Sequence, residues 1–183
     1  MKMKTVFFML VVSLILILSA AVYSQSQLAE PTPPKIVVTV NGKVIDYVVG
    51  INEWDGAVYD RLDTFHTIMK VDSGIEIPYV KLGKLGKLVK IEFMETAPAN
   101  TKLYDALLKR DGSNKYADRV TIDVPVKFVN GKFSFNLEPQ MASKLSSNSA
   151  DYLDGNTLRG FRLICTWGKN KCEYAFVIST DAQ

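Results

Sequence analysis

The chain has 183 residues, of which 48% are apolar and 22% are charged, and this balance is typical of one folded domain and excludes a disordered chain. Lys and Arg number 22 against 19 Asp and Glu, a formal net charge of +3. Lys2 and Lys4 fall in a segment that we expect to be removed, which leaves about +1. No strongly charged face is implied, so a nucleic acid is not expected as a partner.

The N-terminus has the pattern of a secretory signal. Two lysines are followed by an almost unbroken apolar run, Val6–Leu18, and then by small residues. We expect residues 1–24 to be a signal peptide cleaved after Ser24, with Ala21 as the other candidate and an uncleaved anchor as the alternative. The protein is therefore expected to be secreted or associated with the cell surface. It would contact a membrane only through an uncleaved N-terminal segment.

Residues 25–35 contain three prolines among polar residues, which predicts a semi-extended linker. The folded domain is then expected to span residues 36–183, enough chain for a single core.

The first predicted hairpin turns at Asn41-Gly42, the dipeptide that a two-residue type I′ turn prefers. It joins two apolar runs, residues 36–40 and 43–49, and would place Ile36 opposite Tyr47.

The next segment, residues 52–60, carries Trp54 and Tyr59 among acidic residues. An aromatic side chain in a polar loop is a common way to hold a sugar ring or a proline-rich peptide. Trp54, Asp55 and Tyr59 are therefore the candidate ligand-binding residues. The alternative is that Trp54 closes the end of the hydrophobic core. The single histidine, His66, alternates with its neighbours as a strand residue does and is expected to be structural or exposed rather than catalytic.

The middle of the chain alternates apolar and polar residues. This predicts strands at residues 75–80 and 88–94, and a strand rather than a helix at 103–108. The lysines between residues 81 and 90 are expected either to protect an exposed sheet edge or to attract anionic wall polymer or lipid headgroups.

A second hairpin is predicted over residues 120–137, because Asn130-Gly131 repeats the turn signal. Each opposed pair on one face would be apolar, Phe128 with Phe133 among them, and the other face would be polar. One short helix is expected at residues 139–145. The polar loop after it is expected to be solvated, with calcium as the alternative for its Asn and Asp side chains: Asn148, Asp151, Asp154 and Asn156.

The last predicted hairpin, residues 158–179, turns at Gly168-Lys169 and places Cys165 opposite Cys172. Two cysteines in an exported chain favour a disulfide, which would contribute about 2.5 kcal/mol by closing so short a loop. A strict two-residue turn puts this pair at a hydrogen-bonded site, whereas a four-residue turn would bring the cysteines closer. Two sulfurs with one distant histidine cannot complete a zinc shell, so no metal site is assigned.

Five segments of the C-terminal region form a familiar set: Leu137-Glu138-Pro139-Gln140-Met141-Ala142, Leu145-Ser146-Ser147-Asn148-Ser149, Gly155-Asn156-Thr157-Leu158-Arg159-Gly160-Phe161-Arg162-Leu163-Ile164-Cys165, Trp167-Gly168 and Cys172-Glu173-Tyr174-Ala175-Phe176-Val177-Ile178. With them the chain resembles a family of uncharacterised exported proteins from Gram-positive, endospore-forming bacteria. The resemblance spans most of the chain beyond Pro34, including Val49-Gly50 and the region of Trp54. It implies an envelope location and assigns no activity or catalytic residue. Within it, Arg159 and Arg162 fall on opposite faces of one strand, so only one of them can readily reach solvent.

Eight or nine short strands with one short helix predict an all-β, immunoglobulin-like antiparallel β-sandwich, although the antibody-type bridge between sheets is absent. The sequence contains no serine-hydrolase elbow, zinc-protease histidine motif or phosphate-binding loop, so no catalytic residue or cofactor is assigned. We expect a non-enzymatic binding or interaction module at the bacterial cell surface, with a cell-wall polymer or an extracellular protein as its partner. The alternatives are a hydrolase with paired carboxylates and a secreted inhibitor of an extracellular enzyme.

Overall fold

The computed structural model describes residues 32–60, 62–83, 87–117 and 120–182. The predicted signal peptide and most of the predicted linker lie outside these ranges. From Pro33 onward the chain forms one compact unit. In the described ranges, no helix is both long and apolar enough to cross a membrane.

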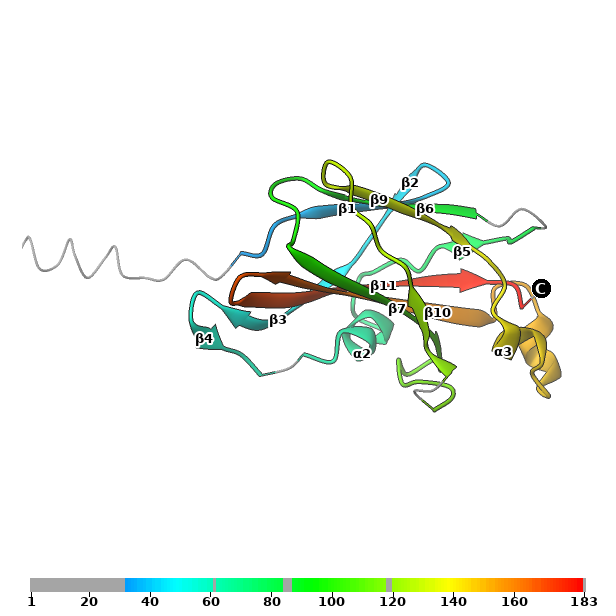
Figure 1. Ribbon diagram of the computed structural model, residues 1–183. Helices are drawn as coiled ribbons and strands as arrows, with labels where there is room; N and C mark the ends of the chain where they lie inside the picture. The colour runs from blue at the N-terminus through cyan, green and yellow to red at the C-terminus, as the bar shows by residue number, and fades with distance from the viewer. Residues whose placement is uncertain (1–31, 61, 84–86, 118–119, 183) are drawn as a thin grey trace, which may run out of the picture. The chain divides into compact units, whose positions relative to one another are not determined.

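Two β-sheets face each other across a hydrophobic core (Figure 1). The small sheet has the order β2-β1-β6-β9 and contains β1 (Ile36–Val40), β2 (Lys43–Ile45), β6 (Lys87–Phe93) and β9 (Lys132–Leu137). The large sheet has the order β4-β3-β11-β10-β7-β8, with β5 beside β11. Its strands are β3 (Val48–Trp54), β4 (Ala57–Val58), β5 (Tyr79–Val80), β7 (Asn100–Leu108), β8 (Ile122–Val124), β10 (Thr157–Trp167) and β11 (Asn170–Thr180). The predicted all-β sandwich is confirmed, with eleven strands among the described residues; the immunoglobulin-like arrangement stays a prediction.

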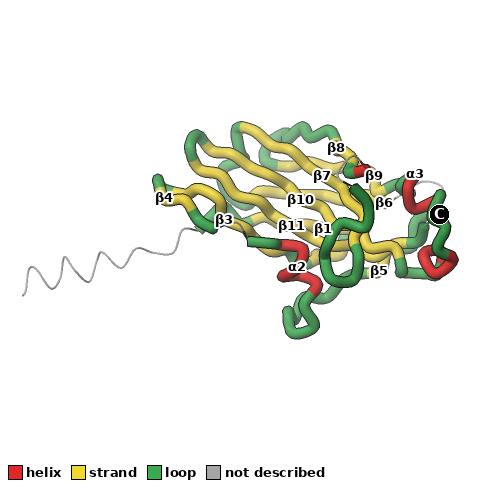
Figure 2. Tube along the Cα trace, turned by 90° about the horizontal axis from the view of Figure 1, so that it is seen from below, coloured by secondary structure: helices red, strands yellow, loops and turns green. Residues whose placement is uncertain are grey.

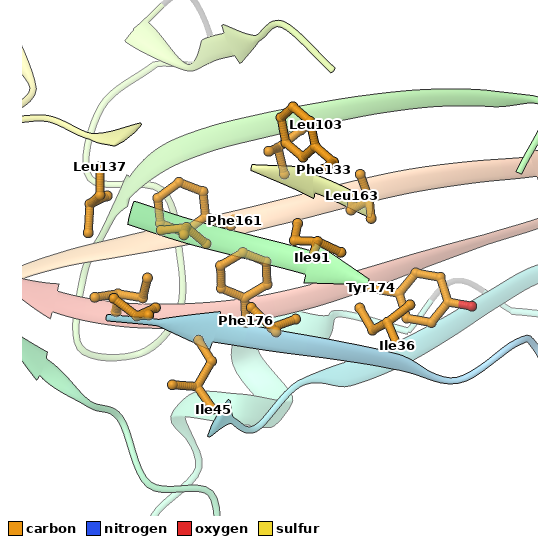
Figure 3. Packing of buried hydrophobic residues seen from close by; sticks show 14 of the residues in the cluster. Ile36, Ile45, Ile91, Leu103, Phe133, Leu137, Phe161, Leu163, Tyr174 and Phe176 are labelled. Atoms are coloured by element: carbon orange, nitrogen blue, oxygen red, sulfur yellow. The ribbon is translucent and has the colours of Figure 1, made fainter. Parts of the chain in front are cut away.

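Alternate residues of the facing strands fill the core (Figure 3). On β10 the odd-numbered Phe161 and Leu163 are fully buried, and on β11 Tyr174 and Phe176 oppose them. Burial of each such side chain stabilises the fold by about 1.5–3 kcal/mol. The other face of the large sheet is covered only in part, by helix α2 (Thr64–Met69) and the chain after it.

Several predicted elements are confirmed. The β10–β11 hairpin has the predicted register, with Cys165 opposite Cys172 and Gly168-Lys169 as its two-residue turn. Residues 103–108 belong to β7, and β6 falls within one residue of the predicted strand at 88–94. The short helix α3 (Met141–Lys144) lies inside the predicted range 139–145 and is followed by a 3-10 helix, Ser149–Tyr152.

The first hairpin is correct only near its turn. β1 and β2 pair as far as Val38 and Ile45, and Ile36 lies opposite Phe93 of β6 rather than opposite Tyr47. After Ile45 the chain leaves the small sheet and enters the large one as β3. A run that is apolar on both faces can be buried more fully by contributing to both layers than by staying at one sheet edge.

The second hairpin pairs as predicted only next to its turn, where Val129 and Lys132 exchange backbone hydrogen bonds around Asn130 and Gly131, whose φ values are 52° and 74°. Its two arms enter different sheets, because β8 pairs with β7 and β9 pairs with β6. Phe133 therefore lies beside Ile91 in the sheet, and its ring contacts Phe128 at a centroid distance of 5.5 Å. The apolar face of the segment is still buried, but across the core between two sheets.

The strand pattern around His66 is also wrong, because residues 64–69 form the helix α2. The carboxylate of Asp63 caps this helix by accepting a hydrogen bond from the His66 backbone N–H at 3.1 Å. Phe65 and Ile68 are buried against the large sheet, a spacing that fits one helical face. Of the strand predicted at 75–80, only β5 forms.

Candidate functional site

Trp54 lies in the core and is 9% exposed. Its ring packs edge to face against that of Trp167, with 5.7 Å between ring centroids. An indole packed in this way has no free face to offer a sugar ring. Trp54 instead closes the end of the core, which is the alternative considered from the sequence.

The other two residues of the predicted ligand site are not brought together around a cavity. Asp55 occupies the β3–β4 turn, where its backbone N–H donates to Asn170 Oδ1 at 3.0 Å. Tyr59 follows β4 and is 37% exposed. Neither Asp55 nor Tyr59 lines any of the four cavities found among the described residues.

Helix α2 lies on the outer face of the large sheet (Figure 2). A polar groove lies on the same face, beside this helix. It consists of two adjoining cavities of about 530 and 350 Å³ that share Phe65, Asn114 and Arg162. The larger cavity is also lined by Tyr104, Thr121 and Asp123, and the smaller by Asp63 and Ser113. We refer to both together as the Arg162 groove.

Strand register places three chemically different side chains in one row across the groove. Arg162 of β10 lies opposite Tyr104 of β7, and Tyr104 lies opposite Asp123 of β8. Since neighbouring strands are about 4.8 Å apart, the Cα atoms of Arg162 and Asp123 are separated by roughly 10 Å. A guanidinium, a phenol and a carboxylate therefore occur in that order along one wall.

Arg162 is held at the floor of the groove by a buried carboxylate and an aromatic ring. Its Nε lies 3.3 Å from Glu173 Oε1, and its guanidinium carbon lies 4.6 Å from the centre of the Phe65 ring. Glu173 is 2% exposed and also accepts a hydrogen bond from Thr64 Oγ1 at 2.8 Å. The Arg162 side chain is 23% exposed, so it can be reached from solvent. Its buried Nε makes no hydrogen bond with the described part of the chain.

Three glycines allow α2 to seat closely enough for these contacts. A Cβ at Gly160 would lie 2.8 Å from Phe65 Cζ, and one at Gly50 would lie 3.0 Å from Thr64 Cγ2. A Cβ at Gly112 would lie 2.7 Å from the backbone nitrogen of His66. Close backbone approach at these positions fixes the helix over the sheet and thereby fixes Phe65 against Arg162.

The opposite end of the row carries a carboxylate with no counter-charge in the described part of the chain. Asp123 is exposed and makes no ion pair or hydrogen bond with the described residues. Asp63, at the other cavity, caps α2 and likewise has no ion pair there. The charge of Arg162 is balanced by Glu173, so among the described lining residues Asp123 and Asp63 give the groove excess negative charge.

The second arginine of β10 has a structural position. Arg159 is 3% exposed, donates through Nε and Nη2 to both carboxylate oxygens of Asp105, and donates through Nη1 to the Glu138 carbonyl. The prediction that only one of the two arginines reaches solvent is confirmed, and the accessible one is Arg162.

Of the lysines in the basic stretch, Lys84 lies outside the described residues, Lys81 lies 3.8 Å from Asp154, and Lys90 lines a cavity of about 550 Å³ on the small sheet. The acidic loop is engaged in local contacts. The Asp151 carboxylate accepts hydrogen bonds from Lys115 Nζ and Ser146 Oγ. Among the described residues, no group of three or more Cys, His, Asp or Glu side chains is arranged to hold a metal ion.

Cys165 and Cys172 are fully buried opposite one another, but both are free thiols in this structure. The two-residue turn puts them at a hydrogen-bonded pair, where Cα atoms are about 5.5 Å apart rather than the closer 4.5 Å of the alternate pairs. Burial raises the pKa of the Cys172 thiol to about 11 and raises the pKa of Cys165 as well, so neither is a ready nucleophile at neutral pH.

Comparison of the chain with known protein families, with characterised proteins and with solved structures gave no match. The family resemblance stays a prediction.

Proposed function

We propose that this protein is an exported, non-enzymatic binding module of the bacterial cell surface, and that its partner binds in the Arg162 groove. The observation that carries the proposal is the way in which the Arg162 side chain is held. A carboxylate is buried at Glu173 and held by Thr64, and the arginine that neutralises it is left open to a cavity. A buried ion pair is costly to form and contributes little net stability. Its use here is to orient a guanidinium toward a ligand.

The size and chemistry of the groove support binding of a small group or chain end. Its two cavities fall within or near the range of about 300–1,000 Å³ that is typical of ligand sites. Its wall combines Tyr104 with the hydrogen-bonding side chains of Asn114 and Thr121. A cell-wall polymer or an extracellular protein segment could present a matching group. The cell-surface location rests on the predicted signal peptide.

The hydrolase alternative has less support. Glycoside hydrolysis needs two carboxyl groups on either side of the scissile bond. The Arg162 groove holds two carboxylates, but Asp123 and Asp63 line different cavities of it, and the other two cavities are lined by Glu92 alone or by no carboxylate. No observation favours a secreted inhibitor.

Co-sedimentation of residues 25–183 with Gram-positive wall sacculi tests the proposal. Thr121→Trp would fill the larger cavity, and Thr39→Trp on the outer face of β1 is the matched control, since both are half-buried threonines. We expect saturable binding that is lost in Thr121→Trp and kept in Thr39→Trp. Equal binding by the two variants would refute the groove as the site.

We also propose that Cys165 and Cys172 become bridged after export. Their direct opposition in the β10–β11 register supports this, and the Cα separation expected at a hydrogen-bonded pair lies within the usual range for disulfides. The intact mass of the secreted protein, alkylated with and without prior reduction, checks the bridge. Alkylation of both thiols in unfolded, unreduced protein would contradict it.

A further inference from the structure

We infer that the Arg162 groove recognises a small zwitterion of the size of a dipeptide, with its carboxylate on Arg162 and its ammonium group on Asp123. The inference rests on the proposed function and names the chemical class of the ligand.

The carboxylate end is assigned to Arg162 because of how the guanidinium is oriented. Its Nε side is turned to Glu173 and one face is stacked on Phe65, which leaves the two Nη groups to point elsewhere. Neither Nη group makes a hydrogen bond with a described residue. A planar pair of N–H donors with fixed orientation matches the two oxygens of a carboxylate. The stacking and the ion pair hold this orientation before the ligand arrives, so little entropy is lost on binding.

The ammonium end is assigned to Asp123 because this carboxylate has no counter-charge among the described residues. It lies on the same outer face as Arg162, with Tyr104 between them in the cross-strand row. The Arg162 side chain leans toward Glu173 of β11, on the side away from Asp123, so it does not shorten the roughly 10 Å between the Cα atoms. An extended dipeptide is roughly 7 Å long, and a charge contact of up to about 4 Å at each end lets it span this distance.

Charge balance discriminates between ligand classes. A simple anion would satisfy Arg162 but would approach the unpaired Asp123, and a simple cation would satisfy Asp123 but leave the Nη groups without an acceptor. A zwitterion satisfies both ends, and it neither adds to nor removes the net charge of the groove. Electrostatic complementarity of this kind determines specificity more than total affinity.

NMR titration of ¹⁵N-labelled residues 25–183 tests the inference with three probes: the dipeptide Ala-Ala, its N-acetyl form and its C-terminal amide. We expect Ala-Ala to shift the backbone amides that line the groove. It should bind at least about tenfold more tightly than either blocked form, since each blocked form loses one charge-assisted contact.

Two variants assign the ends of the ligand. Asp123→Asn should abolish the preference for Ala-Ala over its N-acetyl form, and Arg162→Lys should reduce the preference for Ala-Ala over the amide. Asp154→Asn, an exposed acid outside the groove, is the control and should leave both preferences unchanged. The readout is a ratio of affinities for one variant, so a partial loss of folded protein does not alter it.

Equal affinity for Ala-Ala and its N-acetyl form would overturn the inference, as would groove amides that do not shift at millimolar dipeptide. If either occurs while Thr121→Trp still abolishes sacculus binding, the ligand class is wrong and the groove stands. If Thr121→Trp leaves sacculus binding unchanged, the Arg162 groove is not the binding site.

Discussion

Replacement of Gly112 by Ala should detach the loop that packs on α2. A matched control separates the cost of the left-handed backbone conformation from the cost of the clash between the added Cβ and α2. Gly112 has φ of +87°, a conformation that costs an L-residue about 1–2 kcal/mol. Gly42, in the β1–β2 turn, has φ of +82°, but a Cβ there would meet nothing within 4 Å. Gly42→Ala therefore measures the backbone cost alone.

At Gly112 the added Cβ would also lie 2.7 Å from the Phe65 carbonyl carbon and from the His66 nitrogen. These atoms belong to the helix backbone and cannot rotate away, so the loop or the helix must move. Overpacking of this kind costs about 1–3 kcal/mol beyond the backbone cost. The lower chain entropy of Ala in the unfolded state favours both variants equally and cancels in the comparison.

Urea denaturation of the wild type and of both variants measures the difference. We expect Gly112→Ala to lose at least about 1 kcal/mol more than Gly42→Ala, and to bind sacculi less well because Phe65 no longer fixes Arg162. Equal losses for the two variants would refute the argument that the loop presses on α2.

Three further results are expected. Trp54→Ala should destabilise the fold by about 3–5 kcal/mol through the cavity it leaves beside Trp167. Any loss of sacculus binding should be recovered at low temperature, where the variant is folded. Loss of binding by a fully folded variant would contradict this. Asp105→Ala should cost about 3–5 kcal/mol of stability because it leaves the charge of Arg159 buried and unpaired. The double variant Asp105→Leu with Arg159→Met should regain most of this stability when the variants are compared by thermal melting. A single variant as stable as the wild type would exclude a buried pair. In reduced protein the raised pKa of Cys172 should give full stability below about pH 8.5, the unfolded thiol pKa, and a decline as pH rises toward 11. Urea midpoints of the wild type and Cys172→Ala over roughly pH 7–10 check this, and identical slopes would be inconsistent with it.

The sequence predicted turns better than it predicted sheet partners. Asn130-Gly131 forms the expected turn, yet its arms pair with β7 and β6, because an apolar face can be buried across a sandwich as well as within one sheet. The β10–β11 hairpin was predicted correctly because a long run of opposed residues leaves only one register that buries both strands.

The candidate site could be predicted only in part. Alternation on β10 indicated that Arg159 and Arg162 point to opposite faces, and this is confirmed. Which of the two arginines reaches solvent depends on their partners, Asp105 and Glu173. These acids lie on β7 and β11, and the register of those strands with β10 sets which acid each arginine meets. Trp54 was a misleading signal, since the sequence around an aromatic residue at a strand end is the same whether the ring points into the core or into solvent.

The most direct test of the groove is to map where a wall fragment touches the protein. Soluble fragments from enzymatic digestion of sacculi would be titrated into ¹⁵N-labelled residues 25–183. The account predicts that the perturbed backbone amides cluster at Tyr104, Asn114, Thr121, Asp123 and Arg162. Perturbations that cluster at the β3–β4 turn around Asp55, or around Lys90 on the small sheet, would contradict it.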